Sequence, residues 1–270
     1  MLINGVWSCL FMKKPYIGVT GPTSVEEVDS ILGSFLDAGL FPECDVTPMV
    51  GFLVSYKTLN GQATENLRYP PVASLPALVA ATRDRALPTI HYNSREQNLA
   101  GQVKTLFGPL KGLCKTVQLN VSWPEFQQVA AMKYHGLDII LQLSQGAMEG
   151  KTPVEIANKV ASYGHNIDYV LIDPSGGKGK EFDMDRSQDI WSALTSQCIP
   201  LTIGFAGGFT GENVRGRVHN LRMRGAEKFS IDAEGGLRDK KSNAYGDDTF
   251  NAEKTAAYIK NAVHAFHDPL

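Results

Sequence analysis

Short apolar runs rich in β-branched residues alternate along this chain with segments of amphipathic, helix-forming sequence. Each strand-like segment and the helix-like segment after it take up roughly 30 residues. The predicted strands are 16–20, 49–54, 88–92, 116–120, 137–143, 169–173, 200–205 and 228–232. The predicted helices are 24–36, 72–83, 94–106, 123–134, 153–163, 185–195, 210–222 and 252–266. This alternation predicts an α/β fold, a single-domain (β/α)8 TIM barrel with parallel strands.

The main alternative for such an alternation is an open, doubly wound parallel sheet. That architecture usually carries its glycine-rich loop after the first strand. Here the glycine-rich segments instead follow the last three predicted strands. This distribution favours the barrel. A length of 270 residues suffices for one large domain, and we expect the barrel to span 15–270, after an N-terminal extension at 1–14.

Charge and cysteine content argue against several classes of protein. A net charge of −2 and a pI near 6.3 give no electrostatic basis for binding nucleic acid or an anionic membrane. The four cysteines are scattered and form no CxxC or Cys/His pattern, so no metal site is expected. The start of the chain lacks the order of a secretory signal, and no stretch approaches the roughly 20 apolar residues of a membrane span. We therefore expect a cytoplasmic protein.

In a parallel barrel the carboxyl ends of all strands open on one face, where the active sites of such barrels lie. The residues predicted at this face are Thr20, Ser55, His91, Asn120, Gln142, Asp173, Gly207, Gly208 and 232–236. Two long polar loops, 57–70 and 237–248, follow the second and eighth predicted strands on the same face. They are either lids over a site or solvated connections, and the sequence favours neither.

Several of these segments carry a resemblance to a known family. The clearest are Leu171-Ile172-Asp173 with the glycine-rich run 176–183, Ala206-Gly207-Gly208-Phe209-Thr210 with Glu212-Asn213-Val214, and Ile231-Asp232 with Gly236. Further matching segments are Ile17-Gly18-Val19-Thr20, Val50-Gly51-Phe52-Leu53, Arg68-Tyr69-Pro70 and Val117-Gln118-Leu119-Asn120. In this order and spacing, over most of its length, the chain resembles phosphoribosylanthranilate isomerase, a barrel enzyme of tryptophan biosynthesis.

The resemblance implies an Amadori rearrangement, the aldose-to-ketose isomerisation of a phosphoribosyl amine, without a metal or cofactor. In this chemistry an acid opens the furanose ring and a base removes the proton at sugar C2. By resemblance Asp173 is the acid, and Arg68 contacts the carboxylate of the substrate's aromatic acid. The residues that would bind the substrate phosphate through backbone N–H groups are Gly207, Gly208, Gly235 and Gly236. From the sequence alone, Asp173 could instead cap its own glycine-rich loop, and Arg68 could equally form a surface ion pair.

The base position departs from the family pattern. The family has a cysteine at the end of the first strand, where this chain has Thr20. A hydroxyl does not act as a base near neutral pH without an activating partner. The family's His-Gly after the fourth strand is replaced by Asn120-Val121, which makes Asn120 a candidate for substrate binding. His91 is the best substitute base by residue type, although a lone histidine is often structural.

Glu234 is a second departure, because the family has a small residue at this place beside the phosphate. A carboxylate would repel a phosphate by roughly 1 kcal/mol in water. Glu234 therefore either points away or contacts a ligand without that phosphate. Lys178 and Lys180 could offset its charge if their loop covers the mouth.

Three functions remain open from the sequence. The first is isomerisation of a phosphosugar amine, with a small-molecule phosphosugar or ribosyl substrate. The second is a ribosyl N-glycoside hydrolase or transferase that uses Asp173 and Glu234 as its pair of carboxylates. The third is a non-catalytic barrel that binds a metabolite, since a fold does not determine a function. Assembly as a homodimer is also left open.

Overall fold

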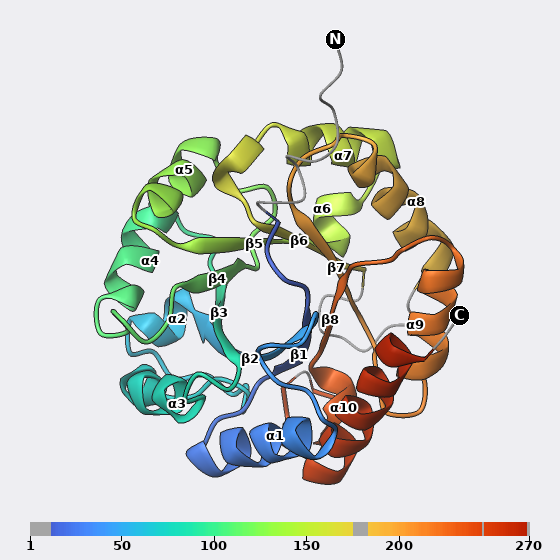
Figure 1. The fold of residues 1–270 in the computed structure, drawn as a ribbon. Coiled ribbons are helices and arrows are strands. Elements are labelled where there is room, and N and C mark those ends of the chain that lie inside the picture. The colour runs from blue at the N-terminus through green and yellow to red at the C-terminus, as the bar shows by residue number, and fades with distance from the viewer. Residues whose placement is uncertain (1–11, 175–182, 245, 269–270) are drawn as a thin grey trace.

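Eight parallel strands close into a barrel in sequence order, as Figure 1 shows from one end. The computed structural model describes residues 12–174, 183–244 and 246–268. The strands are β1 (Tyr16–Thr20), β2 (Thr47–Ser55), β3 (Leu87–Asn93), β4 (Thr116–Leu119), β5 (Asp138–Ser144), β6 (Tyr169–Asp173), β7 (Thr202–Ala206) and β8 (Ser230–Ala233). Pairing of β8 with β1 closes the ring, with Gly18 opposite Asp232. The predicted (β/α)8 barrel is confirmed.

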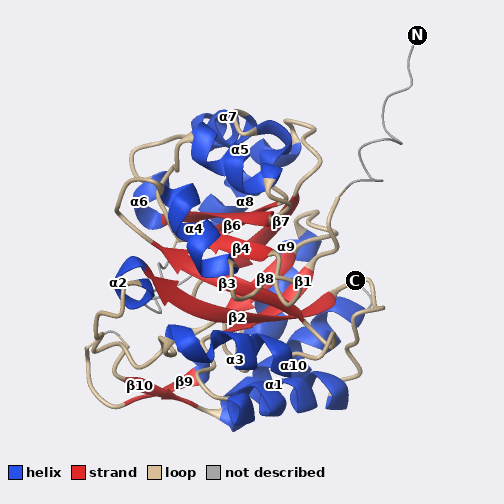
Figure 2. Ribbon diagram, turned by 90° about the vertical axis from the view of Figure 1, so that its left-hand side faces the viewer, coloured by secondary structure: helices blue, strands red, loops and turns tan. Residues whose placement is uncertain are grey.

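Helices surround the barrel on its outside (Figure 1). They are α1 (Val25–Asp37), α2 (Tyr56–Leu59), α3 (Leu75–Ala81), α4 (Leu99–Phe107), α5 (Phe126–Tyr134), α6 (Gln145–Met148), α7 (Pro153–Ala161), α8 (Met184–Thr195), α9 (Val214–Met223) and α10 (Ala252–His267). The short helices α2 and α6 and a two-stranded sheet, β9 (Arg238–Lys240) with β10 (Asp248–Phe250), are additions that the alternation did not predict. They lie at the end of the barrel where the strands terminate (Figure 2).

Side-chain caps decide where the helices begin. The hydroxyl of Ser24 accepts the N–H of Glu27 at the start of α1, as the sequence indicates. The predicted start of a helix at residue 94 is wrong, since α4 begins at Leu99. Asn98 takes the left-handed backbone conformation (φ 60°), and its side chain accepts the N–H of Gly101. Local hydrogen bonding therefore places this helix start later than the periodicity indicates.

The core has two apolar layers, one between the strands and the helices and a smaller one inside the barrel. The inner cluster consists of Tyr16, Met49, Ile140, Tyr169, Leu171 and Ala206. Side chains two residues apart on a strand face the same side, so Asp173 follows Leu171 on the inner face of β6. Buried polar residues also occupy the ends of β1, β3, β4, β5 and β8. An apolar floor with a polar layer above it is therefore the scaffold of the site.

The two long loops after β2 and β8 pack against each other. The N–H of Leu67 donates to the carbonyl of Gly246 at 2.9 Å. Gly246 has a φ of 84°, and a Cβ at this position would collide with the side chain of Asn66. The sequence left open whether these loops are lids or solvated connections. In the described residues they form one packed wall beside the mouth.

The segment before β1 contacts the opposite end of the barrel. The ammonium of Lys13 lies 2.8 Å from Oδ1 of Asp138, and the Tyr169 hydroxyl donates to the carbonyl of Lys14 at 3.1 Å. The expected domain boundary at residue 14 stays a prediction. Within the described parts of the chain, none of the helices has the length and apolar character needed to cross a membrane.

Candidate active site

A pocket of about 180 Å³ opens at the carboxyl ends of the strands. The sequence-predicted site residues that line it are His91, Asn120, Asp173, Gly207, Gly208, Glu234, Gly235 and Gly236. Thr20 and Arg68 are buried beside the pocket and hydrogen-bond to residues that line it. The structure thus brings the predicted site residues together at one place.

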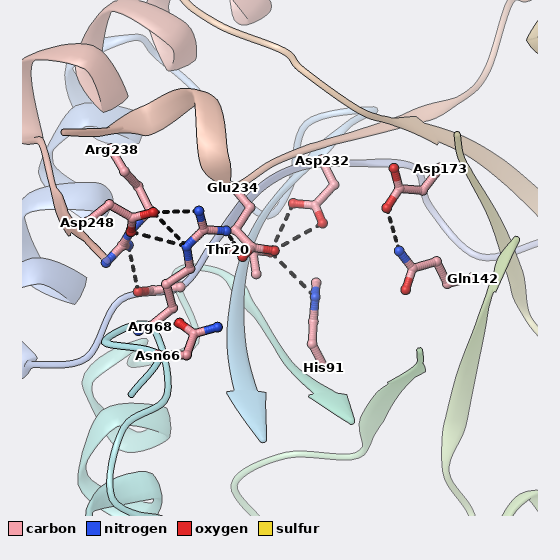
Figure 3. A network of polar contacts seen from close by, with 11 residues as sticks. Thr20, Asn66, Arg68, His91, Gln142, Asp173, Asp232, Glu234, Arg238 and Asp248 are labelled. Atoms are coloured by element: carbon pink, nitrogen blue, oxygen red, sulfur yellow. Dashed lines mark hydrogen bonds and ion pairs between the residues drawn. The ribbon is translucent and has the colours of Figure 1, made fainter. Parts of the chain in front are cut away.

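Asp232, at the end of β8, reaches across to β1. The hydroxyl of Thr20 lies 3.0 and 3.2 Å from the two carboxylate oxygens of Asp232, and 3.5 Å from Nε2 of His91 (Figure 3). All three side chains are buried, and Asp232 lines the pocket. The end of β1 therefore carries a hydroxyl that orients a carboxyl group.

Two glycines leave the space that is filled by the polar cluster of Thr20, His91 and Asp232. A Cβ at Gly18 would lie 2.7 Å from Oδ1 of Asp232. A Cβ at Gly51 would collide with the Thr20 hydroxyl and lie 2.6 Å from Nε2 of His91. Real Cβ atoms do not approach other atoms this closely. The absence of side chains at these positions on β1 and β2 is therefore required for the polar cluster to exist inside the barrel.

Replacing Gly51 by alanine is expected to destabilise the protein by about 1–3 kcal/mol, because the added methyl group overpacks the cluster. Urea unfolding at pH 7.5 measures the change. Gly33→Ala is the matched control, since a Cβ there meets no atom within 4 Å in helix α1. Alanine should be neutral or stabilising at that half-buried helical position, where the space is open. Equal stability of Gly51→Ala and wild type would contradict the packing described above.

The environment of Asp232 favours its protonated form. Burial raises the pKa of Asp232 well above its usual range, and the nearby Glu234 and Asp173 raise it further, whereas the hydrogen bond from Thr20 lowers it. A carboxylate with a raised pKa is a stronger base, once deprotonated, than an ordinary aspartate. Asp232 therefore has the properties of a proton-transfer group in a pocket.

The environment of His91 makes its imidazole a poor base. Burial lowers the pKa of His91 to about 3, so the imidazole is neutral across the physiological range. A ring that resists protonation so strongly is a weak proton acceptor. Its contact with Thr20 indicates a structural role beside Asp232. The environment thus argues against His91 as the base, although residue type alone favours it.

Asp173 occupies the end of β6, as predicted. Its Oδ2 accepts a hydrogen bond from Nε2 of Gln142 at 2.5 Å, and its side chain is 4 % exposed. Gln142 comes from the neighbouring strand β5. The carboxyl group is therefore held in a defined orientation at the pocket wall. The glycine-rich residues that follow it, 175–182, with Lys178 and Lys180, lie outside the described residues.

Asn120 is held by a second amide. Nε2 of Gln118 donates to Oδ1 of Asn120 at 2.9 Å, and both residues line the pocket. Gln118 is 2 % exposed, and its Oε1 has no hydrogen-bond partner in the structure. A buried acceptor without a partner is costly unless a ligand or water supplies a donor. The contact of Asn120 with a substrate stays a prediction.

Arg68 belongs to a buried ion-pair network with Glu234, Arg238 and Asp248 (Figure 3). Its Nη1 lies 2.5 Å from Oε1 of Glu234, and its Nη2 lies 2.6 Å from Oδ2 of Asp248. Arg238 contacts the other oxygen of Asp248 at 2.5 Å and donates to the carbonyl of Gly21 at 3.0 Å. The sequence resemblance assigns Arg68 to a substrate carboxylate. The structure instead gives its guanidinium two carboxylates of the protein itself.

The glycine pair after β7 has a backbone that presents N–H groups. Gly207 and Gly208 have φ values of 114° and 62°. Nη1 of Arg217 donates to both of their carbonyl oxygens at 2.9 Å, and Nδ2 of Asn213 donates to that of Gly208 at 2.8 Å. A trans peptide places its N–H opposite its C=O. The N–H groups of these two peptides therefore point away from Arg217 and helix α9.

The glycine pair after β8 lies against this loop. A Cβ at Gly236 would collide with the carbonyl oxygen of Phe209, so the two loops approach each other at a distance that only glycine allows. Gly235 and Gly236 belong to the short 3-10 turn Gly235–Leu237. The two pairs together form one concave, backbone-lined corner of the pocket. Such corners suit anions, and phosphate binding there stays a prediction.

Sequence reasoning missed several residues of this site. Gln118 could have been found, because it lies near the end of a predicted strand at a position that faces the mouth. Asp232 and Gln142 were predicted at this face, but without a role in the chemistry. Arg238 and Asp248 begin β9 and β10, in a segment that the sequence predicts as a loop, and carry no such signal. Among the described residues, no group of three His, Cys, Asp or Glu side chains could hold a metal ion.

Comparison with known proteins supports the fold. No protein-family model matches the chain, and no curated protein matches it. A solved structure described as native KDPGal is 16% identical, with a TM-score of 0.56, over 94% of this chain and 95% of that one. Tryptophan synthase subunit alpha from Legionella pneumophila is 12% identical, with a TM-score of 0.57, over 94% of this chain and 93% of its own. These likenesses show the fold alone. They do not single out phosphoribosylanthranilate isomerase.

Proposed function

We propose that this protein is an enzyme that isomerises a sugar amine from an aldose to a ketose, by an Amadori-type rearrangement. The observation that carries the proposal is a pair of buried carboxyl groups, Asp173 on β6 and Asp232 on β8, that line one pocket. Gln142 orients the first and Thr20 the second. An isomerisation of this kind needs two separate proton-transfer groups in one pocket.

In this mechanism Asp173 is the acid and Asp232 is the base. Asp173 gives its proton to the ring oxygen as the C1–O bond breaks, and the nitrogen lone pair forms a C1=N iminium. Asp232 then takes the proton from C2, and the C–H electron pair forms the C1=C2 double bond of an enolamine. Asp232 returns its proton to C1, and Asp173 takes the proton of the C2 hydroxyl, which gives the ketose and restores both carboxyl groups. Thr20 acts by holding the Asp232 carboxylate in place.

The glycine-lined corner supports a phosphorylated sugar as the substrate. Gly207, Gly208, Gly235 and Gly236 line the same pocket as the two carboxyl groups. The Glu234 carboxylate is bound by Arg68, which reduces its repulsion of an anion. A phosphate in this corner would place the ribose between the corner and the two aspartates. A phosphoribosyl amine is therefore the form of substrate that we propose.

Glycoside cleavage is the second candidate, because Asp173 and Glu234 line the same pocket. A hydrolase or transferase would use them as acid and nucleophile or base. Burial raises the pKa of Glu234 above its usual value, and the ion pair with Arg68 offsets only part of that rise. The same ion pair occupies Oε1, which reduces the reactivity of Glu234 as a nucleophile. This contact favours the isomerase over the glycosidase.

Turnover of N-phenyl-ribosylamine 5-phosphate, followed by chromatography, tests the proposal. We expect wild type to form the 1-anilino-ketose, and Asp173→Asn to lower kcat by about 10²–10⁴-fold. Asp189→Asn, an exposed aspartate on α8, is the matched control and should keep full activity. Release of free aniline and ribose 5-phosphate would indicate the glycosidase. Binding without either product would indicate a metabolite-binding barrel.

A further inference from the structure

Carboxyl groups are the ionisable side chains that gather around the pocket, beside neutral polar ones. Three carboxyl groups line it, those of Asp173, Asp232 and Glu234, and no lysine or arginine is among the described residues that do so. His91 also lines it, as a neutral ring. A ligand carboxylate in this space would meet the Glu234 carboxylate, with no lysine or arginine side chain among the described lining residues to offset it.

Arg68 is the nearest arginine in the described structure with a contact to a pocket carboxylate, and its guanidinium is already paired. It is 4 % exposed, and its Nε lies 3.1 Å from both oxygens of Asp248. Its Nη1 and Nη2 contact Glu234 and Asp248. A ligand carboxylate would have to displace one of these protein carboxylates and leave it buried without its partner, which is strongly unfavourable.

Glu234 itself remains available to a ligand. Arg68 binds its Oε1, while its side chain is 16% exposed and lines the pocket. Among the described residues its Oε2 has no recorded hydrogen-bond partner. An oxygen that is held in place by an ion pair on the other side of the carboxylate is a preorganised acceptor.

Gln118 on β4, across the ring from Glu234, also has a side-chain acceptor without a partner. Oε1 of Gln118 is buried in the wall of this pocket without a hydrogen-bond partner. The contact of its Nε2 with Asn120 orients the amide. An acceptor of this kind requires a donor from the ligand or from water. Oε2 of Glu234 and Oε1 of Gln118 are therefore two acceptors that hydrogen-bond donors of a ligand would satisfy.

We propose that the group attached to the sugar amine in the substrate carries a hydrogen-bond donor or a positive charge, bound by Glu234, and carries no carboxylate. This inference rests on the proposed function and adds the chemical class of the substrate's second half. A site of this kind differs from one in which Arg68 binds the carboxylate of an aromatic acid. The sugar half, with its phosphate in the glycine-lined corner, is unaffected.

Three stable analogues test the inference by isothermal titration calorimetry at pH 7.5. All are 1-anilino-1-deoxyribitol 5-phosphates, one unsubstituted, one with an ortho-carboxylate and one with an ortho-aminomethyl group. We expect the aminomethyl compound to bind wild type at least about tenfold more tightly than the carboxylate, because two unit charges about 4 Å apart interact appreciably even in a partly hydrated site. This comparison needs no variant.

Two substitutions test whether Glu234 causes the preference for the aminomethyl compound. In Glu234→Gln the preference for the aminomethyl compound should fall by about tenfold or more. Glu253→Gln, an exposed glutamate on α10, should leave it unchanged. Equal or tighter binding of the carboxylate by wild type would overturn the inference and leave the proposed function standing. Failure of all three compounds to bind would overturn the proposed function, and the inference with it.

Discussion

Replacing Asp248 by alanine is expected to destabilise the protein by about 3–5 kcal/mol, the usual effect of removing one partner from a buried ion pair. Asp248 is 3% exposed and holds two arginines, Arg68 and Arg238, through both carboxylate oxygens. Without Asp248, the described hydrogen bond that remains to the guanidinium of Arg238 is the one to the carbonyl of Gly21. The segments after β2 and β8 should then both become less well packed, because Asp248 joins them through Arg68. Urea unfolding at pH 7.5 measures the loss.

Asp239→Ala is the matched control for this prediction. Asp239 lies on the same hairpin, and its ion pair with Lys254 is about half exposed on both sides. Exposed pairs contribute little to stability, so this variant should stay close to wild type. Similar stabilities of the two variants would contradict the claim that the buried network holds this wall together.

The Asp248 network also has a pH dependence of known sign. Burial raises the pKa of Asp248, but hydrogen bonds from Arg68 and Arg238 outweigh burial and hold it below its usual value. A carboxyl whose folded-state pKa is depressed stabilises the protein above its unfolded-state pKa of about 3.9. That contribution is lost as the pH falls through the folded-state value. Asp248→Ala should therefore differ least from wild type in strong acid.

Asp232→Asn is expected to lower the isomerase activity by about 10²–10⁴-fold and, at pH 8, to raise the melting temperature. The activity falls because asparagine cannot take the proton from C2. The stability rises because asparagine fills nearly the same space beside Thr20 without a buried negative charge. Single stabilising substitutions commonly add about 0.5–2 kcal/mol, and we expect a gain of that size. Scanning calorimetry and the turnover assay measure the two effects on the same samples.

The sign of this pH effect follows from the raised pKa of Asp232. A carboxyl with a raised folded-state pKa stabilises the protein fully below its unfolded-state pKa of about 3.9, and this contribution is lost as the pH rises through the folded-state value. The stability gain of Asp232→Asn should therefore be largest at pH 8 and shrink toward pH 4. The wild-type kcat/KM should rise as the pH rises through the raised folded-state pKa of Asp232, because the base is then deprotonated. A gain that grew toward acid would contradict this assignment.

Strand positions were predictable because burial on both faces leaves an unambiguous pattern. The segment 169–173 was predicted within its observed bounds, as was 16–20. Helix starts were less predictable, since α4 begins where Asn98 adopts a left-handed conformation, four residues beyond a serine that is equally able to cap a helix. Competition between neighbouring caps is decided by the tertiary structure and leaves no trace in the periodicity.

The site was predictable where residues sit at strand ends. Asp173 and the glycine pairs follow from barrel geometry, because every strand terminates at the same face. The partners of Arg68 do not, since Glu234 and Asp248 lie 166 and 180 residues away in sequence. The role of Asp232 depends on its contact with Thr20 and on the space left by Gly18 and Gly51. Such contacts across the barrel appear only once the ring is closed.

Removal of the hydrogen from sugar C2 is the step that distinguishes this account most directly from its alternatives. Wild type and Asp232→Asn would each be incubated with N-phenyl-ribosylamine 5-phosphate labelled with ¹³C at C2 and followed by NMR. The account predicts that wild type converts the alcohol-bearing C2 signal into a ketone signal, and that Asp232→Asn does so at least about 100-fold more slowly. Conversion at an equal rate by both proteins, or no conversion by wild type, would contradict it.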